Sequence, residues 1–469
     1  MFLIRPFREH WIQKREKRNI ATIYRKFRLD RISESEINQL LERNAKDPYW
    51  YAILMTIRQS EVIIRAKYNE AQQIAKEVIE EGEQRGNDLI VATGKVLASN
   101  VNIKIGRPVE AETVILEMIP ILKKWNAEII LHLAYTYIGY IAYSRGEHNK
   151  ALNYYEAAIF WARKGNISIL GSLTDKVAVL TELGEFRQAF KLSREVVTRT
   201  RSENRIGLLI YALYDYANIL ISMGELGQAI KAIQECYDLT IKTENPPMQS
   251  AALYLEACVL ELRGQLNEAL ERTMYSEQVM RKIGNMETID EILILRGRLL
   301  TLLGRLEEGR SALEESLRLN QEMQNELYIR KVQLRLTEID VARGHYEEAV
   351  KVIQESLEAF IKAELYDDIQ YAHLVLAQIW LAQECFDDAQ MELQKCHQLS
   401  IKKEDILTRI RSELALAALN VANSKFQKAR RWIRSVMDIS RKLGIIHYVY
   451  EAEKVHSQIE LMEKAARIY

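Results

Sequence analysis

The chain has 469 residues, of which 48% are hydrophobic and 28% are charged, so it is long enough to bury a large core. It contains only 19 Gly and 6 Pro, which argues against an all-β or disordered protein and favours long helices. Its 65 basic residues balance 65 acidic residues, which excludes a globally basic nucleic-acid-binding protein and a protein with an acidic tail.

The first 48 residues do not share the pattern of the rest of the chain. Residues 1–31 contain ten Lys or Arg and three Asp or Glu, with aromatic residues between them. Ser33 followed by Glu36 is a capping-box pattern, and it predicts a short helix that ends near Pro48. We expect residues 1–48 to be either a helical cap or an arm that contacts nucleic acid, acidic lipid or an acidic partner.

Residues 49–445 repeat one short pattern: a small residue, a spacer, Leu or an aromatic residue, two mostly polar residues, and Ala. The segments 184–189 (GEFRQA) and 224–229 (GELGQA) are clear copies. The copies begin at positions 66, 106, 146, 184, 224, 264, 304, 344, 384 and 424, so successive starting positions differ by 40, except once by 38. A fixed period of this length is typical of a helical repeat array.

Each repeat predicts two helices of about 15–18 residues, joined by a tight turn at the first position of the pattern. The residue seven positions before the turn is mostly small, as at Gly139 and Gly297, which allows the paired helices to approach closely. Asn recurs about 20 residues after the turn and marks a second turn, because Asn tolerates positive φ. Pro120 falls within a predicted second helix, which we expect it to kink or end early.

This pattern resembles the tetratricopeptide repeat (TPR) family over about residues 50–445. The resemblance implies an all-α fold, a right-handed superhelical solenoid of about ten antiparallel hairpins. The period of 40 exceeds the family's usual 34, and the Pro that ends each repeat is missing except after one copy, at Pro246 and Pro247. Repeats of this length resemble those in the sensor domains of large ATP-dependent bacterial transcription activators and in peptide-binding quorum-sensing regulators.

Residues 446–469 follow the last repeat and predict one helix that caps the array. Their apolar residues form one helical stripe that ends with Met462: Tyr448, Ala452, Val455, Ile459 and Met462. We expect this stripe to cover the hydrophobic end of the solenoid.

The sequence contains no motif for catalysis or metal binding. Its four Cys are too few for a disulfide scaffold, no two of its eight His have i, i+4 spacing, and GxxxxGK[ST], GxGxxG and GxSxG are absent. Acidic pairs such as Glu307 and Glu308 start second helices, where they stabilise the helix N-terminus. We therefore expect a non-enzymatic protein with neither metal nor cofactor. Without a long apolar run or a signal peptide, we expect no membrane span and a cytoplasmic location.

The resemblance also implies a concave groove lined by the first helix of each hairpin, at positions 13, 10, 6 and 3 residues before each turn. Tyr at these positions offers a large contact area, Asn can both donate to and accept from a peptide backbone, and Arg can hold a carboxylate. Further along the array the same positions include Glu291 and Lys331. The candidate partner-binding residues are Tyr140, Tyr143, Thr174, Tyr211, Tyr214, Asn218, Tyr254 and Arg298. The alternative for any single tyrosine is packing between hairpins.

Together these features predict a scaffold or regulator that holds a protein or peptide in its concave groove. The alternative is a transcription-associated regulator whose basic N-terminal arm contacts nucleic acid, although the chain has no clear helix-turn-helix sequence.

Overall fold

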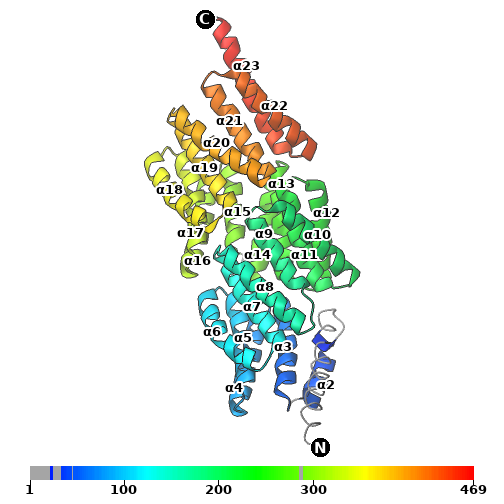
Figure 1. Ribbon diagram of the computed structural model, residues 1–469. Helices are drawn as coiled ribbons and strands as arrows, with labels where there is room; N and C mark the ends of the chain where they lie inside the picture. Colours follow the sequence, from blue (N-terminus) through cyan, green and yellow to red (C-terminus); the bar gives the residue numbers. More distant parts are fainter. Residues whose placement is uncertain (1–21, 25–32, 45, 285–288, 469) are drawn as a thin grey trace, which may run out of the picture.

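The computed structural model describes residues 22–24, 33–44, 46–284 and 289–468, and every regular element within them is an α-helix. Ten antiparallel hairpins, from α3–α4 to α21–α22, follow one another and wind into a right-handed superhelix (Figure 1). The all-α solenoid is thus confirmed. The helices are α2 (Glu34–Asn44), α3 (Pro48–Ile64), α4 (Tyr68–Gln84), α5 (Asp88–Lys104), α6 (Pro108–Lys124), α7 (Glu128–Ser144), α8 (His148–Lys164), α9 (Leu170–Glu182), α10 (Phe186–Ser202), α11 (Ile206–Ser222), α12 (Leu226–Lys242), α13 (Pro246–Leu262), α14 (Leu266–Ile283), α15 (Ile289–Leu302), α16 (Leu306–Glu322), α17 (Glu326–Ala342), α18 (Tyr346–Ala363), α19 (Tyr366–Ala382), α20 (Phe386–Lys403), α21 (Ile406–Ala422), α22 (Phe426–Leu443) and α23 (Ile446–Ile468).

The turn inside each hairpin lies where the repeat pattern predicts it. All ten first positions of the pattern have positive φ, including the three that are not Gly: Ala66, Glu384 and Ser424. At Gly224 the amide donates to Ile221 O at 2.9 Å, and the next amide, of Glu225, donates to Leu220 O at 2.8 Å. These two hydrogen bonds form a Schellman motif, which satisfies the last carbonyls of the helix and requires a left-handed residue at the turn.

The small residues of the repeat let the two helices of a hairpin approach closely. A Cβ atom on Gly139 would lie 2.7 Å from the ring of Tyr155, and one on Gly297 would lie 2.6 Å from Leu313 Cγ. Gly309, which stands where other repeats have Ala, lies opposite Gly297: a Cβ atom there would lie 3.0 Å from Gly297 O. The two helices of this hairpin therefore approach backbone to backbone.

Two units depart from the regular repeat. Helix α6 continues through Pro120, so the prediction that Pro120 ends it early is wrong. Pro120 deprives only the carbonyl of Leu116 of its donor, and Leu116 is exposed, so that carbonyl lies on the solvent side of the helix. The shorter step before Gly184 shortens helix α9, which begins only at Leu170, where the backbone amide donates to Ser168 Oγ at 3.2 Å.

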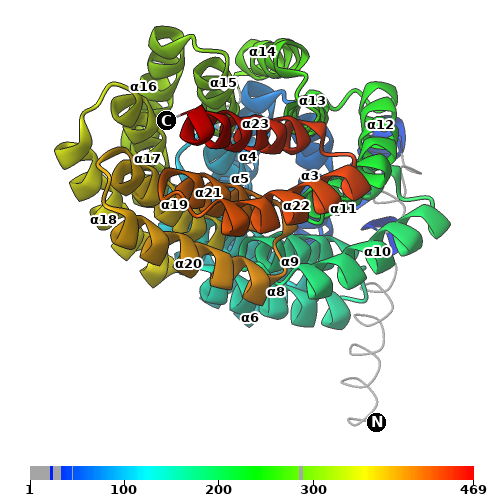
Figure 2. The same ribbon diagram turned by 90° about the horizontal axis from the view of Figure 1, so that it is seen from above.

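The hairpins form two concentric layers. Seen along the axis of the superhelix, the even-numbered helices from α6 to α20 lie outside the odd-numbered helices, whereas α4 and α22, near the two ends, lie closer to the centre of the view (Figure 2). The core lies between the layers and between successive hairpins. One core cluster brings together residues of α10–α13 and α21–α23, which are far apart in the sequence.

The superhelix makes more than one turn, so hairpins far apart in the sequence touch along their edges, and we call this contact the inter-turn seam. The Lys403 ammonium at the end of α20 donates to Leu183 O at 3.0 Å and pairs with Glu185 at 3.2 Å. A Cβ atom on Gly224 would lie 2.8 Å from Leu443 Cδ1 at the end of α22. Further seam contacts join Ser144 to Asn325, Arg187 to Glu404, and Gly264 to His447.

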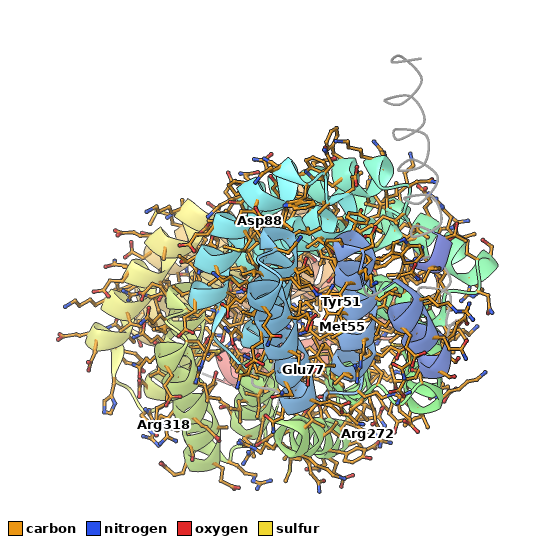
Figure 3. All side chains as sticks on the ribbon, turned by 90° about the horizontal axis from the view of Figure 1, so that it is seen from below. Tyr51, Met55, Glu77, Asp88, Arg272 and Arg318 are labelled. Carbon is orange, nitrogen blue, oxygen red and sulfur yellow. The ribbon has the colours of Figure 1, made fainter. Side chains whose placement is uncertain are left out.

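The N-terminal end begins with α2, where Ser33 Oγ accepts a hydrogen bond from the amide of Glu36 at 3.2 Å, as the capping-box pattern predicts. Asp47 caps α3 and Pro48 is its first residue. Figure 3 shows this end from below, with Tyr51 on α3 and α4 beside it. Of the basic segment 1–31, only 22–24 belong to the described residues, and Tyr24 among them is buried against the core. The alternatives of cap and contact arm stay predictions.

At the other end, α23 packs against α21, α22 and α13. Tyr448, Ala452 and Ile459 of the predicted stripe are buried, while Met462 is 41% exposed. The division of the chain into segments 1–48, 49–445 and 446–469 stays a prediction. Among the described helices, none is both long enough and apolar enough to cross a membrane.

Candidate functional site

The side chains that the odd-numbered helices present to the axis form what we call the inner wall. Burial raises the pKa values of three predicted residues, Tyr143, Tyr214 and Tyr254, and the charge of Glu291 raises each of them further. These tyrosines come from α7, α11 and α13, and Glu291 comes from α15. One carboxylate can act on all three only if the four helices face a common space. The structure thus brings these predicted residues together.

Polar pairs join consecutive helices of the inner wall at one fixed separation. The sequence numbers of each pair differ by 37, which is one repeat less about one helical turn. Four such pairs line the wall: Arg298 with Glu261 at 2.6 Å, Tyr328 with Glu291 at 2.7 Å, Lys331 with Asp368 at 3.0 Å, and Arg411 with Tyr448 at 2.6 Å. Because each pair bridges two helices, we call these pairs rungs. They hold the side chains of the wall in place without a partner.

Arg298, which the sequence predicts to hold a carboxylate of a partner, already pairs with a carboxylate of this chain. Its Nη2 donates to Glu261 Oε2 at 2.6 Å, and Glu261 is nearly buried. Arg298 Nε is buried and has no hydrogen-bond partner among the described residues. The guanidinium is therefore already held by the chain itself, because the acid at the lining position of the preceding repeat lies within its reach.

Acidic groups from several helices surround Lys331. Burial lowers the pKa of Lys331, but Asp368 and Glu182 outweigh burial and the net shift is upward, so the ammonium stays charged. Burial raises the pKa of Glu182, while Lys331 and a hydrogen bond with Tyr143 lower it. Glu182 lies on α9, Lys331 on α17 and Asp368 on α19. The wall therefore carries opposite charges that come from helices far apart in the sequence and act on one another.

The remaining predicted residues differ in what they offer to a partner. Tyr211 is 42% exposed and Asn218 is half-buried, so both present surface. Tyr140 is half-buried, and the Lys104 ammonium lies 5.1 Å from its ring centre. Thr174 is only 6% exposed and its hydroxyl donates to Leu170 O at 3.0 Å within its own helix. The hydroxyl hydrogen of Thr174 is therefore already used within α9.

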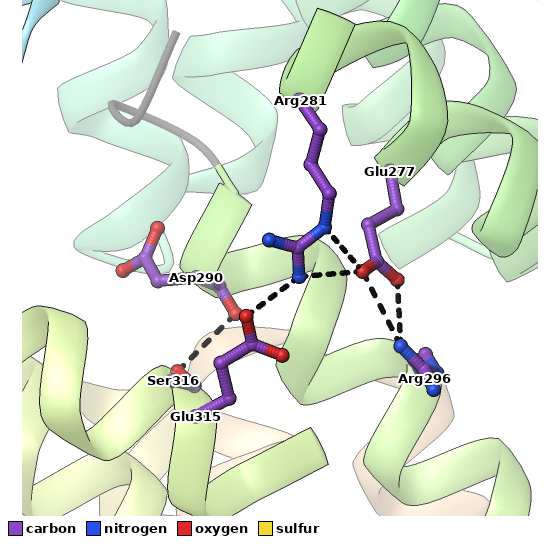
Figure 4. Close-up of polar contacts among 6 residues, drawn as sticks. All are labelled: Glu277, Arg281, Asp290, Arg296, Glu315 and Ser316. Atoms are coloured by element: carbon purple, nitrogen blue, oxygen red, sulfur yellow. Dashed lines mark hydrogen bonds and ion pairs between the residues drawn. The ribbon is translucent and has the colours of Figure 1, made fainter. Parts of the chain in front are cut away.

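Asp290, next to Glu291, is a buried carboxyl without a cationic partner among the described residues. Its Oδ1 has no hydrogen-bond partner in that part of the chain, although hydrogen bonds from the Asn320 side chain and from backbone amides reach the carboxyl, and its main-chain oxygen accepts from Ser316 Oγ at 3.4 Å. Figure 4 shows that Arg281, nearby, bonds to Glu277 and Glu315 instead. Burial, and then Glu291, raise the pKa of Asp290 to about 7.

Sequence reasoning missed three residues of the wall, Glu182, Tyr328 and Asp368. None of them falls at the four positions before a turn that were taken as lining. Complementary polar residues separated by 37 positions were the signal that could have found two of them. Within the described residues, no three His, Cys, Asp or Glu side chains lie together in a way that could hold a metal ion.

Comparison with known families identifies a family to which the chain belongs. The model of the MalT-like TPR region matches residues 176–463, which is more than half of the chain. No curated protein matches.

Several solved structures are similar to the chain. A Rap protein complexed with competence and sporulation factor has 12% sequence identity and a TM-score of 0.60, over 76% of this chain and 99% of that one. The Rap conjugation gene regulator of plasmid pLS20, in complex with the Phr* peptide, has 12% identity and a TM-score of 0.51, over 74% and 97%. The apo form of the quorum sensor NprR from B. thuringiensis has 14% identity and a TM-score of 0.48, over 76% and 99%. At such low identity the first two similarities show the fold alone.

Proposed function

The chain belongs to the family of MalT-like TPR regions, and from this premise we propose that it is a regulator that binds a peptide or protein segment on its inner wall without catalysing a reaction. The convergence of Tyr143, Tyr214 and Tyr254 on Glu291 carries the proposal. Two structures with the same fold support it, because one holds competence and sporulation factor and the other holds the Phr* peptide.

The chemistry of the wall suits an extended segment. Tyrosine rings give contact area at a small cost in conformational entropy, and their hydroxyls can donate to backbone carbonyls. The amide of Asn218 can pair with both the N–H and the C=O of one residue in an extended backbone. Glu291 and Glu261 are acceptors, and a donor of the partner would compete there with Tyr328 and Arg298.

Capture from a library of short synthetic peptides on the immobilised full chain, read out by mass spectrometry, tests the proposal. The inner-wall variant combines Tyr214→Ala and Asn218→Ala with Arg298→Gln and Glu261→Gln. The last two changes are made together, because removing only one partner of a buried ion pair strands the other charge and destabilises the fold. The matched control is Tyr275→Ala, which removes an exposed tyrosine from α14 in the outer layer.

We expect the wild-type chain and the Tyr275→Ala variant to capture the same small set of peptides. The inner-wall variant should capture none of them, while its far-ultraviolet circular dichroism still shows a helical protein. Equal capture by the inner-wall variant would place binding elsewhere. Reproducible turnover in a broad hydrolase screen would refute the non-enzymatic part of the proposal.

A further inference from the structure

Charge is distributed unevenly over the outer helices, although the whole chain is neutral. Helix α22 contains six basic residues and one acidic residue, and α10 contains five and one. By contrast, α16 contains two basic and five acidic residues, and α18 two and four. Figure 1 shows α10 and α22 on one side of the superhelix and α16 and α18 on the other. The outer layer therefore has a basic side and an acidic side.

The strongest basic feature is a stripe on α22 formed by Lys428, Arg431 and Arg434. All three side chains are exposed, and they follow one another every three residues, so each lies about 4.5 Å further along the helix. Within the described part of the chain, no Asp or Glu lies at ion-pair distance from any of them. The intervening Arg430 is different, because it pairs with Glu463 at 2.8 Å.

Folding gives no reason for this stripe. Like charges three or four residues apart on a helix destabilise it by about 0.2–0.5 kcal/mol per pair. Helix α4, in contrast, places opposite charges at such a spacing, in the pair of Lys76 and Glu80 at 3.6 Å. Repulsion between Lys428, Arg431 and Arg434 is thus retained on α22 at some cost to helix stability.

The composition of the stripe favours a polyanion over a protein surface. A protein interface needs an apolar centre with few charges. No large hydrophobic residue of α22 is exposed; the exposed ones on the neighbouring helix α23 are Ile446, Tyr450, Leu461 and Met462. A nucleic-acid backbone, in contrast, needs only cations. From Lys428 to Arg434 the helix rises about 9 Å, and one strand of a duplex carries a phosphate for roughly every 3.4 Å of the duplex axis.

We propose that the outer face of α22 binds the phosphate backbone of a nucleic acid through Lys428, Arg431 and Arg434, without reading its sequence. Its three exposed residues are none of those that form the inner wall, so the two surfaces can be altered separately. It is also distinct from the basic segment 1–31. Each of the three cations contacts one phosphate, and binding releases condensed counterions.

Fluorescence anisotropy tests the proposal with the full chain and a short labelled DNA duplex of mixed sequence, between about 50 and 200 mM NaCl. The variant is Lys428→Gln with Arg431→Gln and Arg434→Gln, because Gln keeps a high helix propensity. The matched control removes three exposed cations from the acidic side: Arg318→Gln, Lys351→Gln and Lys362→Gln. Arg318 is labelled in Figure 3. Circular dichroism of all three proteins checks that they fold.

We expect the wild-type chain and the control to bind with the same salt dependence. Loss of three phosphate contacts should reduce the slope of log K against log salt by about 2.7, which is about a fortyfold difference over a fourfold change in salt. The proposal is overturned if the wild-type chain does not bind the duplex. It is also overturned if the α22 variant keeps the wild-type salt dependence, because binding would then depend on another basic segment. The last outcome concerns competition between a glutamate-rich peptide and unlabelled duplex for the bound labelled duplex. If the peptide displaces the labelled duplex at a lower concentration of negative charges than the unlabelled duplex does, the proposal is also overturned.

Discussion

Replacing Gly309 with Ala restores the residue that other repeats carry at this position, yet we expect it to destabilise the protein. Ala gains about 1 kcal/mol over Gly from helix propensity alone. The new Cβ atom, however, would lie 3.0 Å from Gly297 O and 3.0 Å from Thr301 Oγ1. Gly297 O belongs to the backbone of the facing helix, so the two helices must separate. Overpacking of this kind costs about 1–3 kcal/mol, which offsets or exceeds the propensity gain.

Two other glycines calibrate the size of this effect. Gly227 lies within α12, and a Cβ atom there would meet no other atom within 4 Å, so Gly227→Ala should stabilise by the propensity gain. A Cβ atom on Gly82 would lie 2.6 Å from the backbone nitrogen of Val91, so Gly82→Ala should be the most destabilising of the three.

Urea denaturation followed by circular dichroism measures the order of the three substitutions. The difference between Gly227→Ala and Gly309→Ala removes the shared propensity gain and isolates the packing cost, which we expect to be about 1–3 kcal/mol. If Gly309→Ala stabilises the chain as much as Gly227→Ala does, the close approach of α15 and α16 is refuted.

Three further predictions concern buried groups. Because the pKa of Asp290 is raised to about 7, the stability that depends on its protonation is fully present below about pH 4 and is lost as pH rises through 7. The substitution Asp290→Asn should therefore raise the urea midpoint at pH 8 but not at about pH 4. An equal gain at both pH values would contradict a buried carboxyl at this position. Lys403→Met removes the donor to Leu183 O at the seam and should speed hydrogen exchange there, whereas unchanged exchange would mean that the seam does not depend on this bond. Burial raises the pKa of the Cys236 and Cys396 thiols to about 12, so iodoacetamide at about pH 8 should label them only after denaturation, as mass spectrometry can show.

The repeat period was sufficient to predict the fold, because a fixed period places every turn once a few are recognised. Ala66, Glu384 and Ser424 illustrate this, since none of them favours positive φ and each nevertheless adopts it. The surrounding helices impose the turn on them. At Pro120 only the alternative of an early end was wrong, because an exposed position lets solvent replace the missing hydrogen bond, while the alternative of a kink stays a prediction.

The candidate site could be predicted only in part. Lining positions derived from the repeat place Tyr143, Tyr214 and Tyr254 on the inner wall, where the structure brings them near Glu291. Those positions do not reveal which polar side chains pair with each other, because pairing depends on the tilt between neighbouring hairpins. The pairing of Arg298 with Glu261 therefore does not follow from the repeat pattern.

The inter-turn seam constrains how such an array can change its length during evolution. Gly184 meets Lys403, and Gly224 meets Leu443, so both contacts span the same interval of sequence. Duplication of one hairpin between Gly224 and Lys403 would lengthen that interval by one repeat. Lys403 and Leu443 would then no longer lie opposite Gly184 and Gly224. A hairpin added before Ser144 would leave these partners matched, together with Ser144 and Asn325, so growth near the N-terminal end is the change that the architecture tolerates.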